Sequence, residues 1–473
     1  MIYALLAGGL LGLWGLPLGL GWLGVLWGFF WVKAAPSLNW RTALGFLFIL
    51  SHLQNGWVFY ALLKGGDWPL WQGYPLFLSL LVFTYALLGL FLWVLTSFGG
   101  TKARVFLFPL CYYAFVWLRS EGLGLVGVGP IGSEPWVSLF GPALPLVGAR
   151  FADFLLISAS LLLAWGILAS KGRQRAWGLG LGLLAWLYTL GLFAKLPTQG
   201  EPVVLLVMPW SGVLGDSPSN EAVVKDYLSR FPKEPRLILL PESALPKGAE
   251  MGRDLEQLQS ALAPGQAILV GGDRQELGGD QFVNYNALYY LTPGPFDFSL
   301  YKKQFLVPFA EYKPSWAEAL GLPYLIPRSA PYRIGVPVFF NYAGVTFGPG
   351  ICFEQYREAW YRDREASVQF YSFSSREFLF SPMGKGVLAQ AGRVMARQSY
   401  KPVVKVVNGG LSGVVERPGQ DLGRWVPKIL AGEVEVRPVA EVSPYYRSGL
   451  YWTPLLVVGI SFGLLATFRK KRE

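Results

Sequence analysis

Residues 74–98 read YPLFLSLLVFTYALLGLFLWVLTSF, and no side chain in this stretch is charged. A helix needs about 20 apolar residues to span the hydrocarbon core of a bilayer, so the stretch predicts a transmembrane helix. Seven further apolar runs lie at 2–14, 16–32, 42–63, 103–119, 151–170, 176–194 and 449–468. The first run is short and Gly-rich, so it is a full span, half of a broken helix or a signal-like segment, although it lacks the basic start and cleavage site of a cleaved signal peptide.

The composition also indicates a membrane protein. Of the 473 residues, 53% are hydrophobic and 15% are charged, and the mean hydropathy is +0.37. A soluble domain carries about 25% charged residues. These values exclude a soluble enzyme, a disordered chain and a secreted disulfide scaffold.

Histidine and cysteine are too scarce for several kinds of site. The single histidine, His52, argues against a histidine-based zinc site and against a Ser/His/Asp triad. The two cysteines, Cys111 and Cys352, lie far apart in different contexts and do not form a disulfide framework. We expect any catalysis to use carboxylate, amine or thiol groups.

Lysine and arginine in the short connections predict the orientation of the chain. The connections 33–41, 99–104 and 170–176, together with the tail 469–473, carry eleven cations and one acid. Connections rich in these residues stay in the cytoplasm. We therefore expect seven spans within 1–195, an eighth at 449–468, and segment 198–446 on the exoplasmic side. The net charge of +11 reports this topology and indicates no nucleic-acid partner.

Segment 198–446 differs in pattern from the rest, because short β-branched runs alternate with amphipathic stretches and charged residues become frequent. This pattern predicts one α/β domain. Expected strands are 203–208, 236–240, 267–271, 287–291, 336–341, 368–372 and 403–407. Expected helices are 220–231, 252–263, 355–364 and 386–400.

Three peptides of this domain place a reactive side chain after an apolar strand. They are LLPES at 239–243, YKKQFLVPFAE at 301–311 and GICFE at 350–354. They offer a carboxylate, an amine and a thiol. A thiol needs a base to become a nucleophilic thiolate, and a nearby ammonium both lowers its pKa and stabilises an oxyanion.

In these peptides the chain resembles the nitrilase, or carbon–nitrogen hydrolase, superfamily, and more narrowly the bacterial apolipoprotein N-acyltransferase family. The resemblance implies a Glu242, Lys303 and Cys352 triad, with Glu311 and Glu354 as accessory carboxylates. The family pattern K-x-x-L-V-P-F-x-E selects Lys303 rather than its neighbour in the chain. The implied architecture is a multi-span helical membrane protein that carries an exoplasmic nitrilase-like αββα sandwich.

The chain departs from the family pattern at several positions. Phe305 stands where histidine is usual, and Phe353 where tyrosine is frequent. Residues 374–378 read SSREF where a peptide of the Asn-Asp-x-Trp-Phe type is expected, and the resemblance implies that this loop helps to shape the substrate mouth. The later Asn-Gly element is kept at 408–410.

The function that the resemblance implies is acyl transfer through a cysteine thioester, the final step of lipoprotein maturation. The donor is a phospholipid, and the acceptor is the α-amino group of the diacylglyceryl-cysteine of an apolipoprotein. We expect a monomer in the bacterial inner membrane, with its catalytic domain on the periplasmic side and with no metal or cofactor. Two alternatives stay open: a membrane-tethered amidase, and a non-catalytic lipid-binding scaffold.

Each candidate site residue also has a possible structural role that needs no catalysis. Cys352 would then be a buried thiol, Lys303 a solvated charge, and Glu311 and Glu354 loop anchors rather than groups that tune the triad. For the polar patch at 52–55 we favour helix–helix hydrogen bonds over a functional site.

Two further expectations concern the apolar first part of the chain. We expect Cys111 to be packed or lipid-facing. Aromatic residues of the 119–150 loop, Trp136 and Phe140 among them, are candidates for a lipid entrance.

Overall fold

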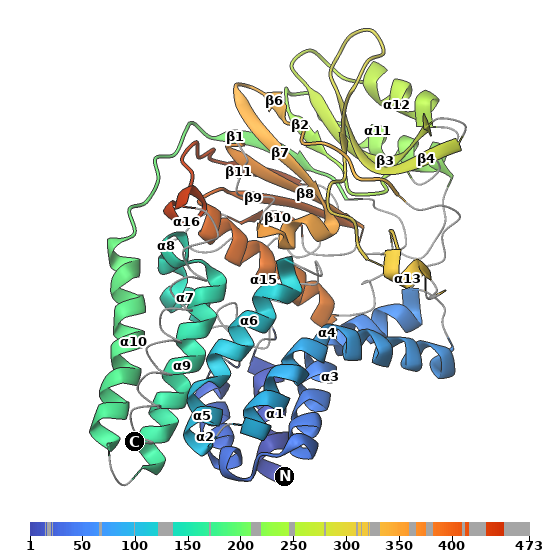
Figure 1. The fold of residues 1–473 in the computed structure, drawn as a ribbon. Coiled ribbons are helices and arrows are strands. Elements are labelled where there is room, and N and C mark those ends of the chain that lie inside the picture. Colours follow the sequence, from blue (N-terminus) through green and yellow to red (C-terminus); the bar gives the residue numbers. More distant parts are fainter. Residues whose placement is uncertain are drawn as a thin grey trace.

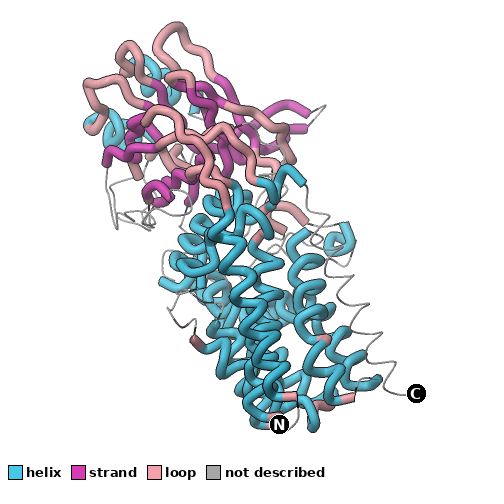
Figure 2. The backbone as a smooth tube through the Cα atoms, turned by 90° about the vertical axis from the view of Figure 1, so that its left-hand side faces the viewer, coloured by secondary structure: helices cyan, strands magenta, loops and turns pink. Residues whose placement is uncertain are grey.

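The computed structural model describes most of the chain. The described residues are 1–14, 16, 20, 22–65, 69–98, 100–121, 136–169, 172–209, 219–245, 251–278, 281–308, 311–313, 315–319, 321, 332–358, 366–374, 382–408, 412–415 and 432–448. They form a bundle of helices with an α/β domain at one end (Figure 2).

The helical region follows the apolar runs of the sequence. Its helices are α1 (Ile2–Trp14), α2 (Leu23–Ala34), α3 (Trp40–Gly65), α4 (Leu70–Phe98), α5 (Thr101–Phe106), α6 (Phe108–Glu121), α7 (Trp136–Phe140), α8 (Leu144–Val147), α9 (Ala149–Leu168) and α10 (Arg173–Phe193). By length and composition, three described helices can cross a membrane: Leu70–Ser97, Ala149–Leu168 and Arg173–Phe193. The chain is thus a membrane protein with three candidate spans. The seven spans expected within 1–195 stay a prediction, and the run 449–468 lies outside the described residues.

Close helix packing in this region depends on small residues. A Cβ on Gly8 of α1 would lie 2.6 Å from the carbonyl oxygen of Phe46 in α3, and a Cβ on Gly28 of α2 would lie 2.5 Å from that of Ser160 in α9. Such approaches are typical of helices that associate in lipid, where van der Waals packing replaces the hydrophobic effect between helices. Outward-facing apolar side chains, such as Val82 at 64% exposure, suit a lipid environment.

The α/β domain contains two sheets (Figure 1). The first has the order β11-β1-β2-β3-β4-β5, with β1 (Val203–Val207), β2 (Leu237–Leu239), β3 (Ala267–Gly278), β4 (Gln281–Leu291), β5 (Ser299–Lys302) and β11 (Gly432–Val436). The second has the order β10-β9-β8-β7-β6, with β6 (Phe340–Tyr342), β7 (Val345–Ile351), β8 (Val368–Ser374), β9 (Val403–Asn408) and β10 (Gly413–Val415). The pairs β1–β2, β2–β3, β7–β8 and β8–β9 are parallel.

The two sheets pack face to face with helices outside. One hydrophobic cluster joins residues of both sheets, among them Leu239 and Phe347. A second cluster joins the other face of the first sheet to α11 (Asn220–Ser229) and α12 (Met251–Ser260). On the second sheet, α15 (Pro382–Ser399) packs against β9. The expected nitrilase-like αββα sandwich is therefore confirmed. Two short helices complete the domain, α13 (Ser315–Ala319) and α16 (Pro444–Ser448).

Polar side chains connect this domain to the helical region. Gln398 of α15 accepts a hydrogen bond from the backbone N–H of Ala149 at the start of α9, at 2.7 Å. Arg150 pairs with Glu358 of the domain at 3.5 Å, and Tyr445 of α16 donates to the same carboxylate at 2.8 Å. These groups are buried, so the ends of α9 and α16 meet the domain at fixed points.

Some elements differ from the sequence expectation. The expected strand 336–341 begins only at Phe340. The first two residues of the expected helix 355–364 belong instead to a 3-10 turn, Cys352–Tyr356, and residues 359–364 lie outside the described residues. Strands β5, β7, β10 and β11 are additional to the expected set.

Strand β7 was not expected from its sequence, VTFGPGI, because a Gly-Pro-Gly segment is typical of a turn. The backbone carbonyl of Thr346 accepts a hydrogen bond from the backbone N–H of Ser367, which lies just before β8. The backbone hydrogen-bonding groups of alternate β7 residues therefore face β8. Those of the residues between them, Pro349 among them, face the opposite side. On that side β6 pairs only with residues 345–347. Pro349 therefore interrupts no ladder hydrogen bond, which is the condition for proline in a strand.

Candidate active site

The three reactive peptides come together where strands of the two sheets end. Glu242 follows β2, Lys303 follows β5, and Cys352 follows β7. Glu242 and Lys303 belong to the first sheet and Cys352 to the second, which faces it. The sandwich thus places a carboxylate, an amine and a thiol at one end of its interior.

Glu242 is held by tight packing behind its backbone. A Cβ on Gly271 of β3 would lie 2.4 Å from the carbonyl oxygen of Pro241 and 2.7 Å from the Cα of Glu242, so only glycine fits there. The Glu242 side chain is buried at 7% exposure. The next residue, Ser243, has a φ of 53°, a left-handed conformation that turns the chain sharply after the carboxylate.

Lys303 is fully enclosed at 1% exposure. Its Nζ donates to Oε1 of Glu311 at 2.8 Å. Burial by itself lowers the pKa of Lys303, but the charges of Glu311, Cys352 and the neighbouring carboxylates outweigh that effect and raise the pKa above its ordinary value. The side chain is therefore an ammonium at neutral pH.

Glu311 anchors the loop after β5. Its Oε1 accepts from Lys303 and its Oε2 accepts from the backbone N–H of Val307 at 2.8 Å. The backbone N–H of Glu311 donates to the Val307 carbonyl at 2.8 Å, so the loop closes on itself. Glu311 thus both fixes the loop and pairs with the ammonium.

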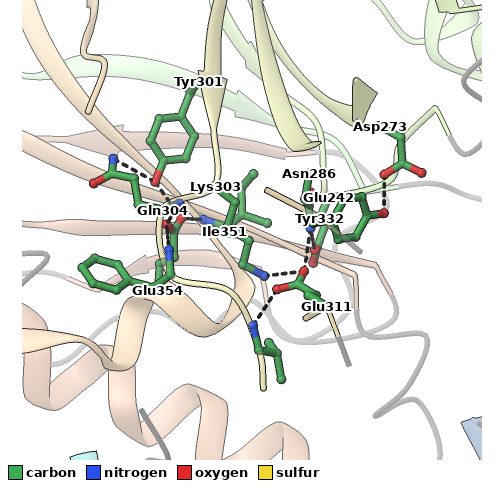
Figure 3. A network of polar contacts seen from close by, with 12 residues as sticks. Glu242, Asp273, Asn286, Tyr301, Lys303, Gln304, Glu311, Tyr332, Ile351 and Glu354 are labelled. Carbon is green, nitrogen blue, oxygen red and sulfur yellow. Dashed lines mark hydrogen bonds and ion pairs between the residues drawn. The ribbon is translucent and has the colours of Figure 1, made fainter. Parts of the chain in front are cut away.

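Asn286 is a site residue that the sequence patterns did not reveal. It lies on β4, and its Nδ2 donates to Oε1 of Glu242 at 2.6 Å and to Oε1 of Glu311 at 3.1 Å. Figure 3 shows the amide between the two carboxylates. One signal was available: Asn286 shares its strand face with the core residue Leu288, and a polar residue on a core face needs a partner.

Cys352 occupies a strained turn. Its φ is 52°, which is uncommon for a residue with a Cβ and is found often at active sites. It starts the 3-10 turn Cys352–Tyr356 directly after β7. The half-buried Cys352, with Phe305 and Phe353, packs against a hydrophobic cluster that runs from the helical region to α15 and β9. The thiol therefore lies at the junction of the domain and the helices.

Glu354 ties two of the peptides together. This carboxylate is fully buried and accepts four hydrogen bonds, from the Tyr301 hydroxyl (2.7 Å) and the backbone N–H groups of Ile351 (2.7 Å), Gln304 (2.6 Å) and Phe305 (3.0 Å). Burial raises the pKa of Glu354, and Lys303 and these donors oppose the rise. Its contacts fix the loop after Lys303 against the turn that carries Cys352.

The polar patch at 52–55 and Cys111 lie in the helical region, away from the three reactive peptides. In the patch at 52–55, Asn55 donates to the Tyr85 hydroxyl at 3.0 Å and Tyr85 donates to Gln54 at 2.6 Å, which confirms helix–helix hydrogen bonding. Cys111 packs against the core of the bundle.

Two other peptides are described only in part. Phe140 is buried and Trp136 stacks on it, while most of the loop before them lies outside the described residues. Residues 375–381 and 409–411, which include most of the altered peptide and the Asn-Gly glycines, also lie outside them. Within the described part of the chain, no three His, Cys, Asp or Glu side chains gather as metal ligands.

A carboxylate, a buried ammonium and a thiol on a strained turn can together perform nucleophilic acyl transfer. In general a carboxylate can accept the proton of a thiol, and an ammonium can stabilise both a thiolate and an oxyanion. The chemistry of the three groups favours a covalent thioester route.

Comparison with known proteins identifies homologues. No model of a known protein family matches the chain. Apolipoprotein N-acyltransferase of Ralstonia nicotianae is 24% identical over 484 residues, 93% of this chain and 87% of that protein. The enzymes of Brucella melitensis and Caulobacter vibrioides are each 26% identical, over 82% and 73% of this chain and 77% and 70% of their own lengths.

Solved structures that match about half of the chain share little sequence with it. A CN-hydrolase superfamily protein from Xanthomonas campestris matches 51% of this chain and 91% of its own, with 14% identity and a TM-score of 0.35. An amidase from Nesterenkonia sp. matches 54% of this chain and 96% of its own, with 15% identity and a TM-score of 0.34.

Proposed function

We propose that this chain, a homologue of apolipoprotein N-acyltransferases, transfers an acyl chain from a phospholipid to the terminal amine of a diacylglyceryl-cysteine through a thioester on Cys352. The observation that carries the proposal is the buried chain of hydrogen bonds from Glu242 through Asn286 and Glu311 to Lys303. It supplies a base and an ammonium beside a thiol that borders the membrane helices.

In the first half-reaction Glu242 accepts the proton of the Cys352 thiol. The thiolate attacks an ester carbonyl of the phospholipid, and the Lys303 ammonium with a backbone N–H holds the oxyanion. When the tetrahedral intermediate collapses, the C–O bond breaks. Glu242 returns its proton to the leaving oxygen, which departs as the hydroxyl of a lysophospholipid.

In the second half-reaction the amine of the acceptor attacks the thioester carbonyl. Glu242 removes a proton from the attacking nitrogen, an amide forms, and the C–S bond breaks. The released thiolate of Cys352 then takes up that proton from Glu242. The products are an N-acylated lipoprotein and the starting form of the enzyme.

The physical cost of moving lipid into water supports a site at the bilayer surface. Each buried CH₂ of an acyl chain is worth about 0.8 kcal/mol, so both substrates are held in the membrane. Cys352, Phe305 and Phe353 contact the hydrophobic cluster shared with the helical region, which gives the chains an apolar path to the thiol.

Intact-mass analysis of the purified full chain tests the proposal. Incubation with a phospholipid should add the mass of one acyl group at Cys352, and a diacylglyceryl-cysteine peptide should discharge it as an N-acyl peptide. Cys352→Ala is the control and should form no adduct. Discharge by water at the same rate with and without the peptide would indicate the tethered amidase instead. No adduct at all would leave a lipid-binding scaffold.

The side of the membrane is a further part of the proposal. Single cysteines at Arg173 and Asn220, in a Cys111→Ser and Cys352→Ser background, should differ in labelling by a membrane-impermeant maleimide in intact cells. We expect labelling at position 220 and protection at position 173. Protection at position 220 would contradict the periplasmic placement.

A further inference from the structure

We propose that a groove between α1, α3 and α4 is a binding site for one phospholipid, which lays an acyl chain in the groove and its phosphate on Arg41. The inference goes beyond the proposed reaction and does not depend on it. The lipid at this site is a resident of the helical bundle and not a substrate.

The groove has the size and the lining of a site for an apolar chain. Its volume is about 740 Å³, and pockets that hold small molecules have volumes of about 300–1,000 Å³. Three small residues, Gly45, Ala86 and Gly89, line it. They lie beside large exposed side chains such as Phe48 of α3 and Val82 of α4. Large side chains next to small ones leave a furrow in which a hydrocarbon chain gains van der Waals contacts.

The groove lies near the end of the bundle that is remote from the catalytic domain. Helices α1 and α3 run in the same direction, because Gly8 meets Phe46 and Gly12 meets Leu53 across their contact. The N-terminus, where α1 begins, lies at the end opposite the α/β domain (Figures 1 and 2). The α3 residues of the groove lie within 44–52, and α3 begins at residue 40, about one helical turn earlier. The groove is therefore separate from the site at Cys352.

The interior of the groove asks for no polar group in its occupant. Its α4 residues belong to the candidate membrane span Leu70–Ser97, so this face meets hydrocarbon. The polar side chains that line it already have partners. The Ser51 hydroxyl donates to the Phe48 carbonyl at 3.1 Å, and Nδ1 of His52 bonds to the same carbonyl at 2.7 Å. The Tyr85 hydroxyl donates to Gln54 at 2.6 Å.

Arg41 places a positive charge at the remote end of the groove. It precedes Gly45 and Phe48 on α3 by four and seven residues, which is the spacing of one helix face. Its side chain is exposed, and its guanidinium lies over the Trp40 ring at 5.8 Å from the centroid. The sequence from 1 to 120 contains a single acid, Asp67, which comes after the end of α3. The charge of Arg41 is therefore not compensated by an acid of its own helix.

A phosphate joined to an acyl chain matches both parts of this site. A guanidinium binds a phosphate through two parallel hydrogen bonds. Basic side chains at the membrane surface beside transmembrane helices are typical of sites for lipid head groups. Free phosphate has no part that can occupy the apolar groove, whereas a phospholipid supplies the anion and the chain in one molecule.

Photo-crosslinking of the full chain tests the site. The chain is placed in phosphatidylcholine vesicles that contain a small fraction of phosphatidylglycerol with a diazirine in one acyl chain. Peptide mapping by mass spectrometry should find more adducts in 44–52 and 78–89 than on the exposed face of α10 within 181–193. Ala86→Phe fills the groove and should lower its adducts to the level of the α10 face. Ala185→Phe, the same change at an exposed position of α10, is the matched control and should leave the groove adducts at the parent level.

Arg41→Gln tests the head group. It should lower groove adducts of the phosphatidylglycerol probe by about fivefold, the usual effect of one basic residue near anionic lipid. Diacylglycerol with the same diazirine chain should label the groove less than phosphatidylglycerol does, and equally in the parent and in Arg41→Gln. Arg175→Gln, at an exposed position in the first turn of α10, is the control and should behave as the parent.

Three outcomes would overturn the inference. They are equal adducts on the groove and the α10 face in the parent, unchanged groove adducts in Ala86→Phe, and equal labelling of the groove by the two probes. Melting temperatures in detergent show that each variant is folded. None of these outcomes bears on the thioester proposal, which the adduct at Cys352 tests separately.

Discussion

The helical region and the α/β domain both contain a network of buried polar side chains, but the two networks differ in composition. Between the helices the network consists mainly of amides and hydroxyls, with Tyr85 bonded to Gln54, Asn55 and Arg119. In the domain the network consists mainly of carboxylates around one ammonium, Lys303.

The difference in charge between the two networks indicates that they serve different roles. Neutral groups can satisfy one another at little cost, so they suit the joining of helices. Buried charges carry a large desolvation penalty that hydrogen bonds only partly offset. Substitutions in the two networks should therefore differ in effect.

The largest effect is expected at the thiol. Cys352→Ala should reduce acyl transfer by about 10⁴-fold or more, because it removes the only atom that forms the thioester. Thermal unfolding in detergent should be nearly unchanged, since the half-buried thiol makes no disulfide. Activity within a few-fold of the parent would end the covalent mechanism.

The second-largest effect is expected at the ammonium of Lys303. Lys303→Met should slow both half-reactions by about 10²–10³-fold, the usual loss for one oxyanion donor. It should also lower the free energy of unfolding by about 3–5 kcal/mol, because Glu311 is left buried without its partner. Rapid-quench measurement of adduct formation and discharge separates the two steps.

Lys302→Met is the control for this substitution, because Lys302 is partly exposed and pairs with Glu276 at 2.6 Å outside the site. It should retain full activity. Equal losses in the two lysine variants would contradict the choice of Lys303.

The raised pKa of Lys303 also predicts a pH dependence. Its contribution to stability is complete below the pKa of an unfolded lysine, about 10.4, and is lost only as pH rises through the higher folded value. Urea unfolding of the parent between about pH 6 and pH 9 should therefore show no loss from this group. A fall in stability across that range that is absent in Lys303→Met would contradict the assignment.

A moderate effect is expected at the loop anchor. Glu354→Gln replaces a carboxylate that accepts four hydrogen bonds by an amide with one oxygen, so N–H groups then face N–H groups. We expect a loss of about 1–3 kcal/mol in the free energy of unfolding. We also expect a roughly 10- to 100-fold lower turnover, because the turn of Cys352 shifts. Glu256→Gln, at an exposed position of α12, should leave both quantities unchanged.

The smallest effect is expected between the helices. Tyr85→Phe removes the hydroxyl that bonds to Asn55 at 3.0 Å and Gln54 at 2.6 Å. Hydrogen bonds of this kind in membrane bundles are worth about 0.6 kcal/mol on average, so the melting temperature should fall only slightly. Acyl transfer should persist. A loss of turnover comparable to that of Glu354→Gln would show that the helical network serves the reaction.

Much of this molecule could be predicted from local patterns. Runs such as 74–98 became helices, and the expected strands of the first sheet lie where alternation placed them. The reactive peptides were visible because Glu242, Lys303 and Cys352 each follow a strand. Strand β7 was among the strands that local pattern missed, because its Gly-Pro-Gly centre has the composition of a turn, and its place beside β8 makes it extended.

Sequence alone shows that the chain is apolar enough for a membrane, that an α/β pattern follows the apolar first part, and which three reactive groups that segment offers. These follow from composition and short-range spacing. The hydrogen-bond partners of those groups are set by the three-dimensional fold. Asn286 reaches Glu242 and Glu311 because β4 lies beside β5 in one register, and Glu354 joins two loops far apart in sequence. Such contacts depend on strand register and sheet packing, which no short stretch of sequence specifies.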